Sequence, residues 1–339
     1  MKIILIGFGT VGQGLVQILR DKAADLQTRY AFAPSIVGVA TRTRGVLFHA
    51  GGLSPDHLLA AIEQGGLAHY PDTDGLIRDW TTEQLIAQSG ADVYVDASPT
   101  DLQTGQPSLG YCQAALDNHM HLVLANKGPI AVGYHALVKQ AASVGRRVLF
   151  EGTVMAGTPS LRLGMQALAG CTIREARGIL NGTTNFILTQ MEAGRDYADV
   201  LAEAQRLGYA EADPTADVDG WDAAGKAIIL AAALFNVKLT FADMEVSGIS
   251  HLTTADIDTA RTSGERWKLI AHVTPQGGSV KATRIPITHP LAAVSGATNA
   301  VTFTTDLMGD ITLIGAGAGR IQTGFGLLSD LLDLHCQER

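Results

Sequence analysis

Hydrophobic and polar positions follow two different patterns along the chain. Up to about residue 150, short apolar runs alternate with longer segments in which apolar residues recur at helical spacing. The apolar runs predict strands at 2–6, 35–41, 91–97, 121–125 and 147–150. The periodic segments predict helices at 11–26, 82–89, 107–117 and 134–144, whereas residues 44–80 are rich in glycine and predict an irregular surface insertion. This alternation predicts an α/β domain built on a doubly wound parallel sheet with helices on both faces.

The pattern changes after Glu151. Helical periodicity predicts helices at 158–169, 185–192, 197–207 and 220–235, interrupted by a strand at 172–180. Runs at 267–273, 280–286, 300–306 and 310–314 then predict antiparallel strands joined by short turns. The last helix, at 322–334, is too short to fold alone, so we expect it to pack on the first domain. The prediction is therefore one domain at 1–150 plus 315–339 and a second, α+β domain at 151–314.

Composition narrows the classes of function. The chain has 339 residues and a formal net charge of -8, which argues against nucleic acid as the main partner because phosphate binding needs a basic face. No apolar run reaches 18 residues and the N-terminus begins with a strand, so we expect neither a membrane span nor a leader peptide. Cys112, Cys171 and Cys336 are widely spaced, which indicates a reducing cytoplasm rather than disulfides or a zinc site.

A glycine-rich turn follows the first strand. Gly7, Gly9 and Gly12 form a GxGxxG motif between a predicted strand and a predicted helix, the context that a dinucleotide-binding fingerprint requires. Gly7 permits a tight turn, Gly9 lets the backbone approach a pyrophosphate, and Gly12 lets the helix pack closely on the strand. The motif predicts a Rossmann-type domain. The alternative is a glycine turn in an α/β domain that binds no nucleotide.

The end of the second strand bears on the choice of nucleotide. An acid there bonds the ribose 2′-hydroxyl of NAD, whereas arginine suits the 2′-phosphate of NADP. Residues 39–44 read Val-Ala-Thr-Arg-Thr-Arg and contain no acid. Arg42 and Arg44 therefore favour NADP, and the alternative is a solvated arginine pair at a strand end.

The segment from 206 to 226 concentrates acids before a single lysine. It contains Glu211, Asp213, Asp217, Asp219 and Asp222, followed by Lys226. The last two are four residues apart and share one face of a helix, so the carboxylate can orient the ammonium. Such a lysine is suited to moving a proton while a cofactor moves a hydride. The alternative is helix capping, in which residue 219 is the N-cap and residue 222 lies at N3.

A second lysine follows a buried strand. Lys127 comes directly after the apolar run 121–125, which places it at the carboxyl end of a strand, where open α/β sheets bind ligands. For either lysine taken alone, a surface ion pair is the more common role.

Six segments together identify a family. They are 7–12, 125–129 (ANKGP), 151–159, 181–187 (NGTTNFI), 208–226 and 315–319 (GAGAG). In these segments the chain resembles homoserine dehydrogenase over nearly its whole length. The resemblance implies NAD(P)H-dependent, reversible reduction of L-aspartate 4-semialdehyde to L-homoserine, in threonine and methionine biosynthesis. The other classes left open are another Rossmann amino-acid dehydrogenase, such as aspartate dehydrogenase, and a non-catalytic NADP-binding redox sensor.

The resemblance also implies roles for individual residues. Lys226 and Lys127 match the family's proton-transfer pair, and Asp222 is the residue that we expect to orient the first of them. The expected substrate-binding residues are Glu211, Asp222, Lys127, Asn181, Gly182 and Thr183. The expected cofactor-binding residues are Gly7, Gly9, Thr10, Val11, Gly12, Arg42, Arg44, Ser98, Gly317 and Gly319. Asp213 and Asp217 are expected to cap the turn or to support the residues that contact substrate.

Three further expectations come from the resemblance. Glu151, Val154, Ala156 and Thr158 match a loop that holds a monovalent cation, sodium, although Met155 stands where the family often has glycine. Family members pair through the sheet of the second domain, so a homodimer is expected. The chain ends soon after residue 319, which implies a short form without a C-terminal regulatory domain and without allosteric inhibition by threonine.

Overall fold

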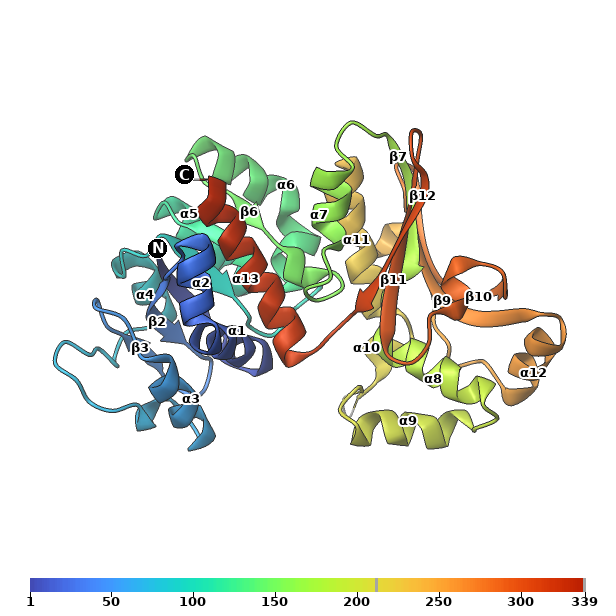
Figure 1. Ribbon diagram of the computed structural model, residues 1–339, viewed down its shortest axis with the longest axis horizontal. Coiled ribbons are helices and arrows are strands. Elements are labelled where there is room, and N and C mark those ends of the chain that lie inside the picture. Colours follow the sequence, from blue (N-terminus) through green and yellow to red (C-terminus); the bar gives the residue numbers. More distant parts are fainter. Residues whose placement is uncertain (211–212, 338–339) are drawn as a thin grey trace. The chain divides into compact units, whose positions relative to one another are not determined.

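The computed structural model describes residues 1–210 and 213–337. The chain forms two compact units, one made of Met1–Gly157 with Gly319–Arg339 and the other of Thr158–Ala318 (Figure 1). The chain passes from one unit to the other after Gly157 and again after Ala318, each a few residues later than the boundary expected from the sequence. Among the described residues, no helix is long and apolar enough to cross a membrane.

The first unit is built on one sheet. Its strands are β1 (Lys2–Ile6), β2 (Ser35–Ala40), β3 (Val46–Phe48), β4 (Val93–Asp96), β5 (His121–Leu124) and β6 (Val148–Leu149). In the described part of the chain the order is β3-β2-β1-β4-β5-β6, with β3 antiparallel to β2 and every other pairing parallel. The predicted α/β fold is confirmed. The direction of winding reverses between β1 and β4, which is where such sheets bind dinucleotides.

Helices pack against this sheet. They are α1 (Thr10–Asp21), α2 (Ala23–Tyr30), α3 (Pro55–Glu63), α4 (Thr82–Gln88), α5 (Ser108–Asp117), α6 (Lys127–Ser143) and α13 (Arg320–Gln337). The C-terminal α13 packs on α1, as expected, and glycines permit the close approach: a Cβ on Gly14 would lie 2.0 Å from the Arg320 carbonyl oxygen. The single helix predicted at 11–26 is wrong, because the helical path breaks at Lys22, where ψ is 12°.

The segment 44–80 is more ordered than its glycine content suggests. It contributes β3 to the sheet edge, a helix α3 and a 3₁₀ turn at Leu67–His69. Ser54 caps α3 by accepting a hydrogen bond from the His57 N–H, and Pro55 occupies the first helical position. The prediction of an irregular insertion is therefore wrong. A three-residue strand is too short to show periodicity, but Ser-Pro before an apolar helix was a usable start signal.

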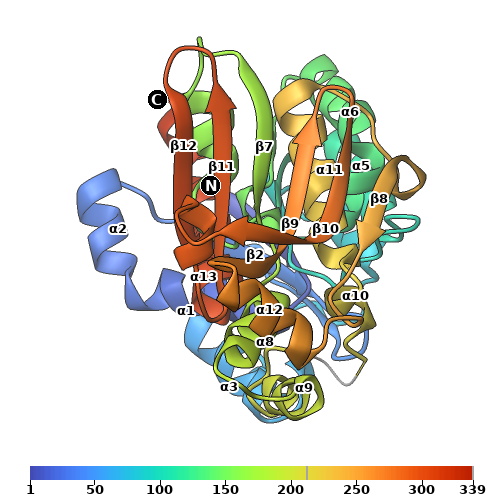
Figure 2. The same ribbon diagram turned by 90° about the vertical axis from the view of Figure 1, so that its right-hand side faces the viewer.

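The second unit also contains one sheet. Its strands are β7 (Ile173–Ile179), β8 (Met244–Ser247), β9 (Glu265–Thr274), β10 (Gly277–Pro286), β11 (Thr298–Thr305) and β12 (Gly309–Ala316). The order among described residues is β12-β11-β7-β9-β10-β8 (Figure 2), and the pairings are antiparallel except for β8 with β10. The predicted α+β character is confirmed, whereas β8 has no counterpart in the prediction.

The helices of this unit lie both on the sheet and on one another. They are α7 (Ser160–Arg162) with a π-helical turn at Leu163–Ala167, α8 (Gly182–Glu192), α9 (Tyr197–Arg206), α10 (Thr215–Val218), α11 (Trp221–Phe235) and α12 (Thr254–Thr262). Of these, α8, α11 and α12 contact the strands of the sheet, whereas α9 packs on α8 and α10 packs on α8 and α11. A Cβ on Gly164 would lie 2.5 Å from Leu234 of α11 and 3.5 Å from Phe303 of β11, so these elements are in close contact.

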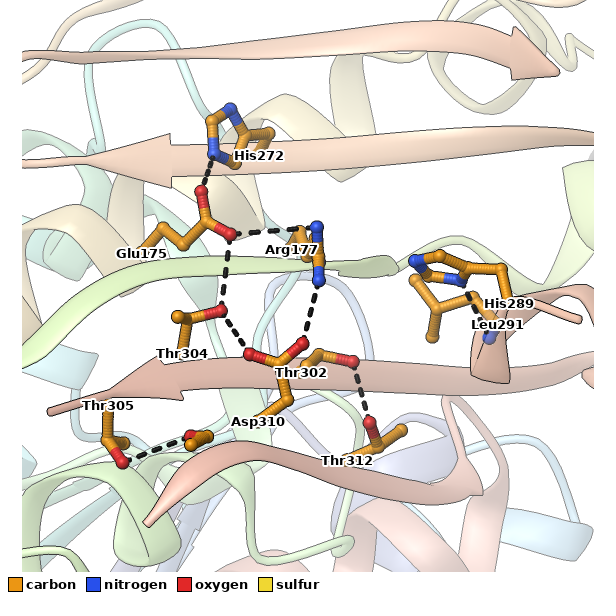
Figure 3. Close-up of polar contacts among 11 residues, drawn as sticks. Glu175, Arg177, His272, His289, Leu291, Thr302, Thr304, Thr305, Asp310 and Thr312 are labelled. Carbon is orange, nitrogen blue, oxygen red and sulfur yellow. Dashed lines mark hydrogen bonds and ion pairs between the residues drawn. The ribbon is translucent and has the colours of Figure 1, made fainter. Parts of the chain in front are cut away.

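A polar network crosses the same sheet on the side that bears Glu175 and Arg177 (Figure 3). The His272 ring Nε2 lies 2.9 Å from Glu175, and Arg177 pairs with Asp310 at 2.8 Å. The Thr304 hydroxyl oxygen lies 2.7 Å from Asp310 and 3.2 Å from Glu175, and its one proton can bond either carboxylate. Burial raises the pKa of Glu175, but the bonds from His272 and Thr304 and the charges of His272 and Arg177 together leave this pKa below its usual value. The network links four neighbouring strands, and its side chains are half-buried except for that of Asp310, which is exposed.

Candidate active site

The glycine turn of the first unit has the geometry that the fingerprint predicts. Gly7 follows β1 with a φ of +91°, and Gly9 is the N-cap of α1, so Thr10 and Val11 begin that helix. A Cβ on Gly12 would lie 2.3 Å from the Gly7 carbonyl oxygen, which excludes any side chain there. The helix therefore presents its first N–H groups at the end of β1, an arrangement suited to a pyrophosphate.

The two arginines lie in a turn after β2. Thr41 shapes this turn by accepting a hydrogen bond from the Arg44 N–H at 2.8 Å and by donating to the Gly45 carbonyl at 2.9 Å. The side chains of Arg42 and Arg44 are exposed. The turn carries no acid, as the sequence indicated, so it offers positive charge at the carboxyl end of β2.

Two further predicted residues follow neighbouring strands. Ser98 comes after β4, and its backbone N–H and hydroxyl both donate to Asp96. Lys127 is half-buried and is the first residue of α6, which Asn126 caps by accepting from the Gly128 N–H at 3.0 Å. The helix begins seven residues earlier than predicted because Pro129 fits in its first turn, where its missing N–H breaks no helical bond.

The predicted cation loop divides between the units. Glu151, Val154 and Ala156 lie in the first unit and are buried, and the Glu151 N–H donates to Asp330 at 2.9 Å. Thr158 belongs to the second unit, where its hydroxyl donates to the Ala316 carbonyl at 3.0 Å. Met155 has a φ of +56° and Ala156 a φ of +54°, the left-handed region that glycine adopts more easily.

In the second unit, Lys226 is fixed on α11. Its ammonium lies 2.7 Å from Asp222 and donates to the Leu180 carbonyl at 2.7 Å, and the residue is only 7% exposed. The predicted pairing on one helix face is confirmed. The capping alternative is wrong because Gly220, with a φ of +91°, is the N-cap of α11, while Asp219 accepts from the Ser250 hydroxyl at 3.2 Å.

Asn181 joins this pair to the start of α8. Its amide nitrogen donates to Asp217 at 2.7 Å and to Asp222 at 3.0 Å, while its amide oxygen caps α8 by accepting from the Thr184 N–H at 2.9 Å. Burial, together with the neighbouring charge of Asp222, raises the pKa of Asp217. One connected cluster therefore contains Asn181, Asp217, Asp222 and Lys226. In it Asp217 contacts Asn181 and does not act as a cap.

The other candidates in this unit have contacts of their own. Thr183 donates to the Tyr209 carbonyl at 2.6 Å, and a Cβ on Gly182 would lie 2.7 Å from the Ala297 carbonyl oxygen. Asp213 accepts from the Thr215 N–H at 3.1 Å, so it caps the turn that starts α10. Hydrogen bonds from the hydroxyl and the N–H of Thr215 lower the pKa of Asp213. Glu211 lies outside the described residues.

The glycine-rich segment 315–319 spans the boundary between the second unit and the C-terminal part of the first. In the second unit a Cβ on Gly317 would lie 2.1 Å from the amide of Asn299, so the position excludes a side chain. Gly319 opens the C-terminal part of the first unit with a φ of +136°. Sequence reasoning missed Asp96 and the Leu180 carbonyl, neither of which stands out without the fold.

Chemically, the cluster on α11 can deliver a proton. A buried ammonium held by one carboxylate and one carbonyl is a positioned acid, and the acids around it can bind a second ammonium. The first unit offers an anion-binding turn at the point where dinucleotides bind. Together these features fit an oxidoreductase that acts on a small amino acid.

Sequence comparison covers both units. The family described as "Homoserine dehydrogenase" matches residues 159–332, and "Homoserine dehydrogenase, NAD binding domain" matches residues 7–151. The chain belongs to the homoserine dehydrogenase family. It is therefore an NAD(P)-dependent oxidoreductase of amino-acid biosynthesis that interconverts L-homoserine and L-aspartate 4-semialdehyde.

Individual relatives align with this chain over nearly their full length. The NAD(+)-dependent homoserine dehydrogenase of Pseudomonas canavaninivorans is 43% identical over 98% of this chain and 96% of its own. Homoserine dehydrogenase of Methanocaldococcus jannaschii is 37% identical over 99% of this chain and 98% of its own. A hyperthermophilic archaeal homoserine dehydrogenase in complex with NADPH superposes with a TM-score of 0.85 at 28% identity, covering 99% of this chain and 98% of that one.

Proposed function

We propose that Lys226 is the acid and base of this homoserine dehydrogenase. Reduction of the aldehyde puts a hydride on carbon and a proton on oxygen, and a lysine ammonium can polarise that oxygen and then protonate it. The observation that carries the proposal is the buried ion pair of Lys226 with Asp222, fixed further by the Leu180 carbonyl. In the oxidising direction the same nitrogen accepts the proton from the hydroxyl of homoserine.

The remaining groups would bind the amino-acid end of the substrate. Carboxylates are natural partners of its ammonium, so we assign this contact to Glu211 and Asp222. Lys127 is assigned to the substrate carboxylate and to the second position of the proton-transfer pair. Gly182 and Thr183, at the start of α8, would line the pocket with backbone N–H groups and a hydroxyl. Residues 1–150 plus 315–339 would hold the cofactor, and 151–314 the substrate.

The rival activity makes a different prediction about substrate. An aspartate dehydrogenase would reduce its cofactor with L-aspartate, whereas the proposed chemistry needs a hydroxyl carbon as the hydride donor. We expect L-homoserine, and not L-aspartate, to form reduced cofactor with the purified protein, as followed by absorbance. Turnover of L-aspartate alone would contradict the proposal, and binding of NADP without turnover of either compound would favour the redox sensor.

For the cofactor we propose a preference for NADP over NAD. The turn after β2 has two exposed arginines and no acid, which suits a 2′-phosphate. The glycine-turn residues and Ser98 would contact the rest of the dinucleotide, and Gly317 and Gly319 would allow close approach of the backbone. The relatives differ on this point, since one is named as NAD(+)-dependent and another was solved with NADPH.

Replacing Arg42 and Arg44 together by alanine tests this preference. Each charge-assisted bond to the phosphate contributes about 1.5–3 kcal/mol, so we expect KM for NADP to rise at least about tenfold while KM for NAD changes less than about twofold. Steady-state kinetics with both cofactors provide the measurement. Arg20→Ala, at an exposed arginine of α1, is the control for loss of a surface charge. Equal losses with both cofactors would show that the pair does not read the 2′-phosphate.

Two finer assignments complete the proposal. We propose that the protein is a homodimer that pairs through the face of the second sheet bearing the Glu175 network, whose side chains are half-buried or exposed in a single chain. Sedimentation velocity tests this, since a monomer at micromolar concentration would contradict it.

We also propose a sodium ion at the loop of Glu151, because a buried carboxylate beside backbone carbonyls is the donor set that a hard cation prefers. Equal thermal stability in sodium and choline salts would contradict that site.

A further inference from the structure

A buried carboxyl group at the end of β4 gathers four hydrogen-bond donors. Asp96 is 0% exposed. Its Oδ1 accepts from the backbone N–H of Ser98 at 2.8 Å and from the hydroxyl of Ser98 at 2.7 Å. Its Oδ2 accepts from the Tyr94 hydroxyl at 3.1 Å and from the Ser108 hydroxyl. All four donors are neutral, so none of these contacts is an ion pair. The carboxyl group holds polar groups in and after β4 by hydrogen bonds alone in these four contacts.

The position of Asp96 in the sheet matters. It pairs with Ile6, the last residue of β1, at the point where the winding of the sheet reverses. Ser98 lies directly against the glycine turn, because a Cβ on Gly7 would come within 2.4 Å of the Ser98 backbone nitrogen. The two bonds from Ser98 to Asp96 therefore fix the backbone that packs on the fingerprint.

The Ser98 hydroxyl also connects the end of β4 to the residues that follow β5. Ser98 Oγ accepts from the Asn126 amide at 3.0 Å, and Asn126 caps the helix whose first residue is Lys127. A serine hydroxyl has one proton and two acceptor lone pairs. The proton is committed to Asp96 and one lone pair to Asn126, which leaves the second lone pair able to accept a hydrogen bond from a ligand.

We propose that Asp96 is a positioning residue for the dinucleotide, acting through Ser98. By holding both the N–H and the hydroxyl of Ser98, it aims the remaining lone pair of that hydroxyl at a donor of the bound cofactor. This inference rests on the proposed function, namely that the dinucleotide binds at the glycine turn. Alanine at position 96 would remove both carboxyl oxygens, so the N–H and the hydroxyl of Ser98 would both lose their acceptor. Asparagine would not test this, because its amide oxygen could keep both Ser98 bonds while its NH₂ group donates to the hydroxyls of Tyr94 and Ser108, which can rotate to accept.

The test is the affinity for NADPH, measured by titrating its fluorescence with the purified protein. Asp96→Ala and Ser98→Ala should each weaken binding about fivefold to tenfold, the effect of one lost hydrogen bond. The double variant should bind no more than about twofold more weakly than the weaker single variant, because both changes remove the same contact. Tyr94→Phe is the matched control: it also removes a donor from Asp96, but it leaves both Ser98 bonds, so NADPH affinity should stay within about twofold of wild type.

Three outcomes would overturn the inference. They are additive effects in the double variant, equal weakening by Tyr94→Phe and Asp96→Ala, and wild-type affinity in Ser98→Ala. The last of these decides the matter alone if Asp96→Ala does not fold. Failure of the wild-type protein to bind NADPH would instead contradict the proposed cofactor site, so the two failures are distinguishable.

Discussion

Lys226→Arg should fold, bind cofactor and lose nearly all turnover. Arginine keeps a positive charge near Asp222, but its guanidinium stays protonated in proteins and cannot exchange a proton with substrate. Loss of a positioned acid and base lowers rates by about 10²–10⁴-fold, so we expect kcat for homoserine oxidation to fall at least about 100-fold. Stopped assays of product and steady-state kinetics at saturating cofactor measure this change.

Two companion variants sharpen that result. Lys226→Ala should lose the same activity and also stability, since breaking a buried pair leaves Asp222 without its cation and costs about 3–5 kcal/mol. Lys238→Ala, at an exposed lysine just beyond α11, should leave kcat unchanged. If Lys226→Arg retains more than a third of the wild-type kcat, the proton passes through Lys127 or water instead.

A second buried lysine should make stability depend on alkaline pH. Lys268 is 0% exposed, and its ammonium donates to the Val294 carbonyl at 2.8 Å and to the Asn185 amide oxygen at 3.2 Å. Burial lowers the pKa of Lys268 from 10.5 to about 8, against a smaller opposing effect of the Glu192 charge. The folded protein therefore holds this proton less tightly than the unfolded chain does.

The sign of the effect follows from proton binding. Below pH 8 the lysine is protonated in both states and its destabilising contribution is constant. Between pH 8 and 10.5 the unfolded state binds more protons, so stability from this group rises with pH, by about 3 kcal/mol over the whole interval. Urea unfolding across this range should show wild type gaining stability relative to Lys268→Met, which lacks the titrating group. Parallel pH profiles for the two proteins would refute the assignment.

Features that are local in the chain could be predicted from the sequence. The glycine turn needs only its own neighbours, and the pairing of Asp222 with Lys226 needs only a helix. The cap of α12 was equally readable, because Thr253 and Asp256 form a capping box, although no helix was predicted there. Short strands such as β3 and β8 gave too few residues for a period to emerge.

Features that join distant segments could not be predicted. Asn181 reaches Asp217 and Asp222 only because β7 ends and α8 begins beside these two acids. Asp96 reads as the end of an apolar strand, and its hydrogen bonds include one from Ser108, which follows twelve residues later. In the loop after Glu151 the sequence indicated that Met155 is unusual, and the backbone there is left-handed, a conformation that glycine adopts more easily.

The most direct test of the account is the initial rate of reduced-cofactor formation from L-homoserine by the purified wild-type protein. We predict homoserine-dependent formation of NADPH, faster with NADP than with NAD at subsaturating cofactor, and its abolition in Lys226→Arg. Absence of any homoserine-dependent reduction of either cofactor, in a folded protein that binds NADPH, would contradict the account.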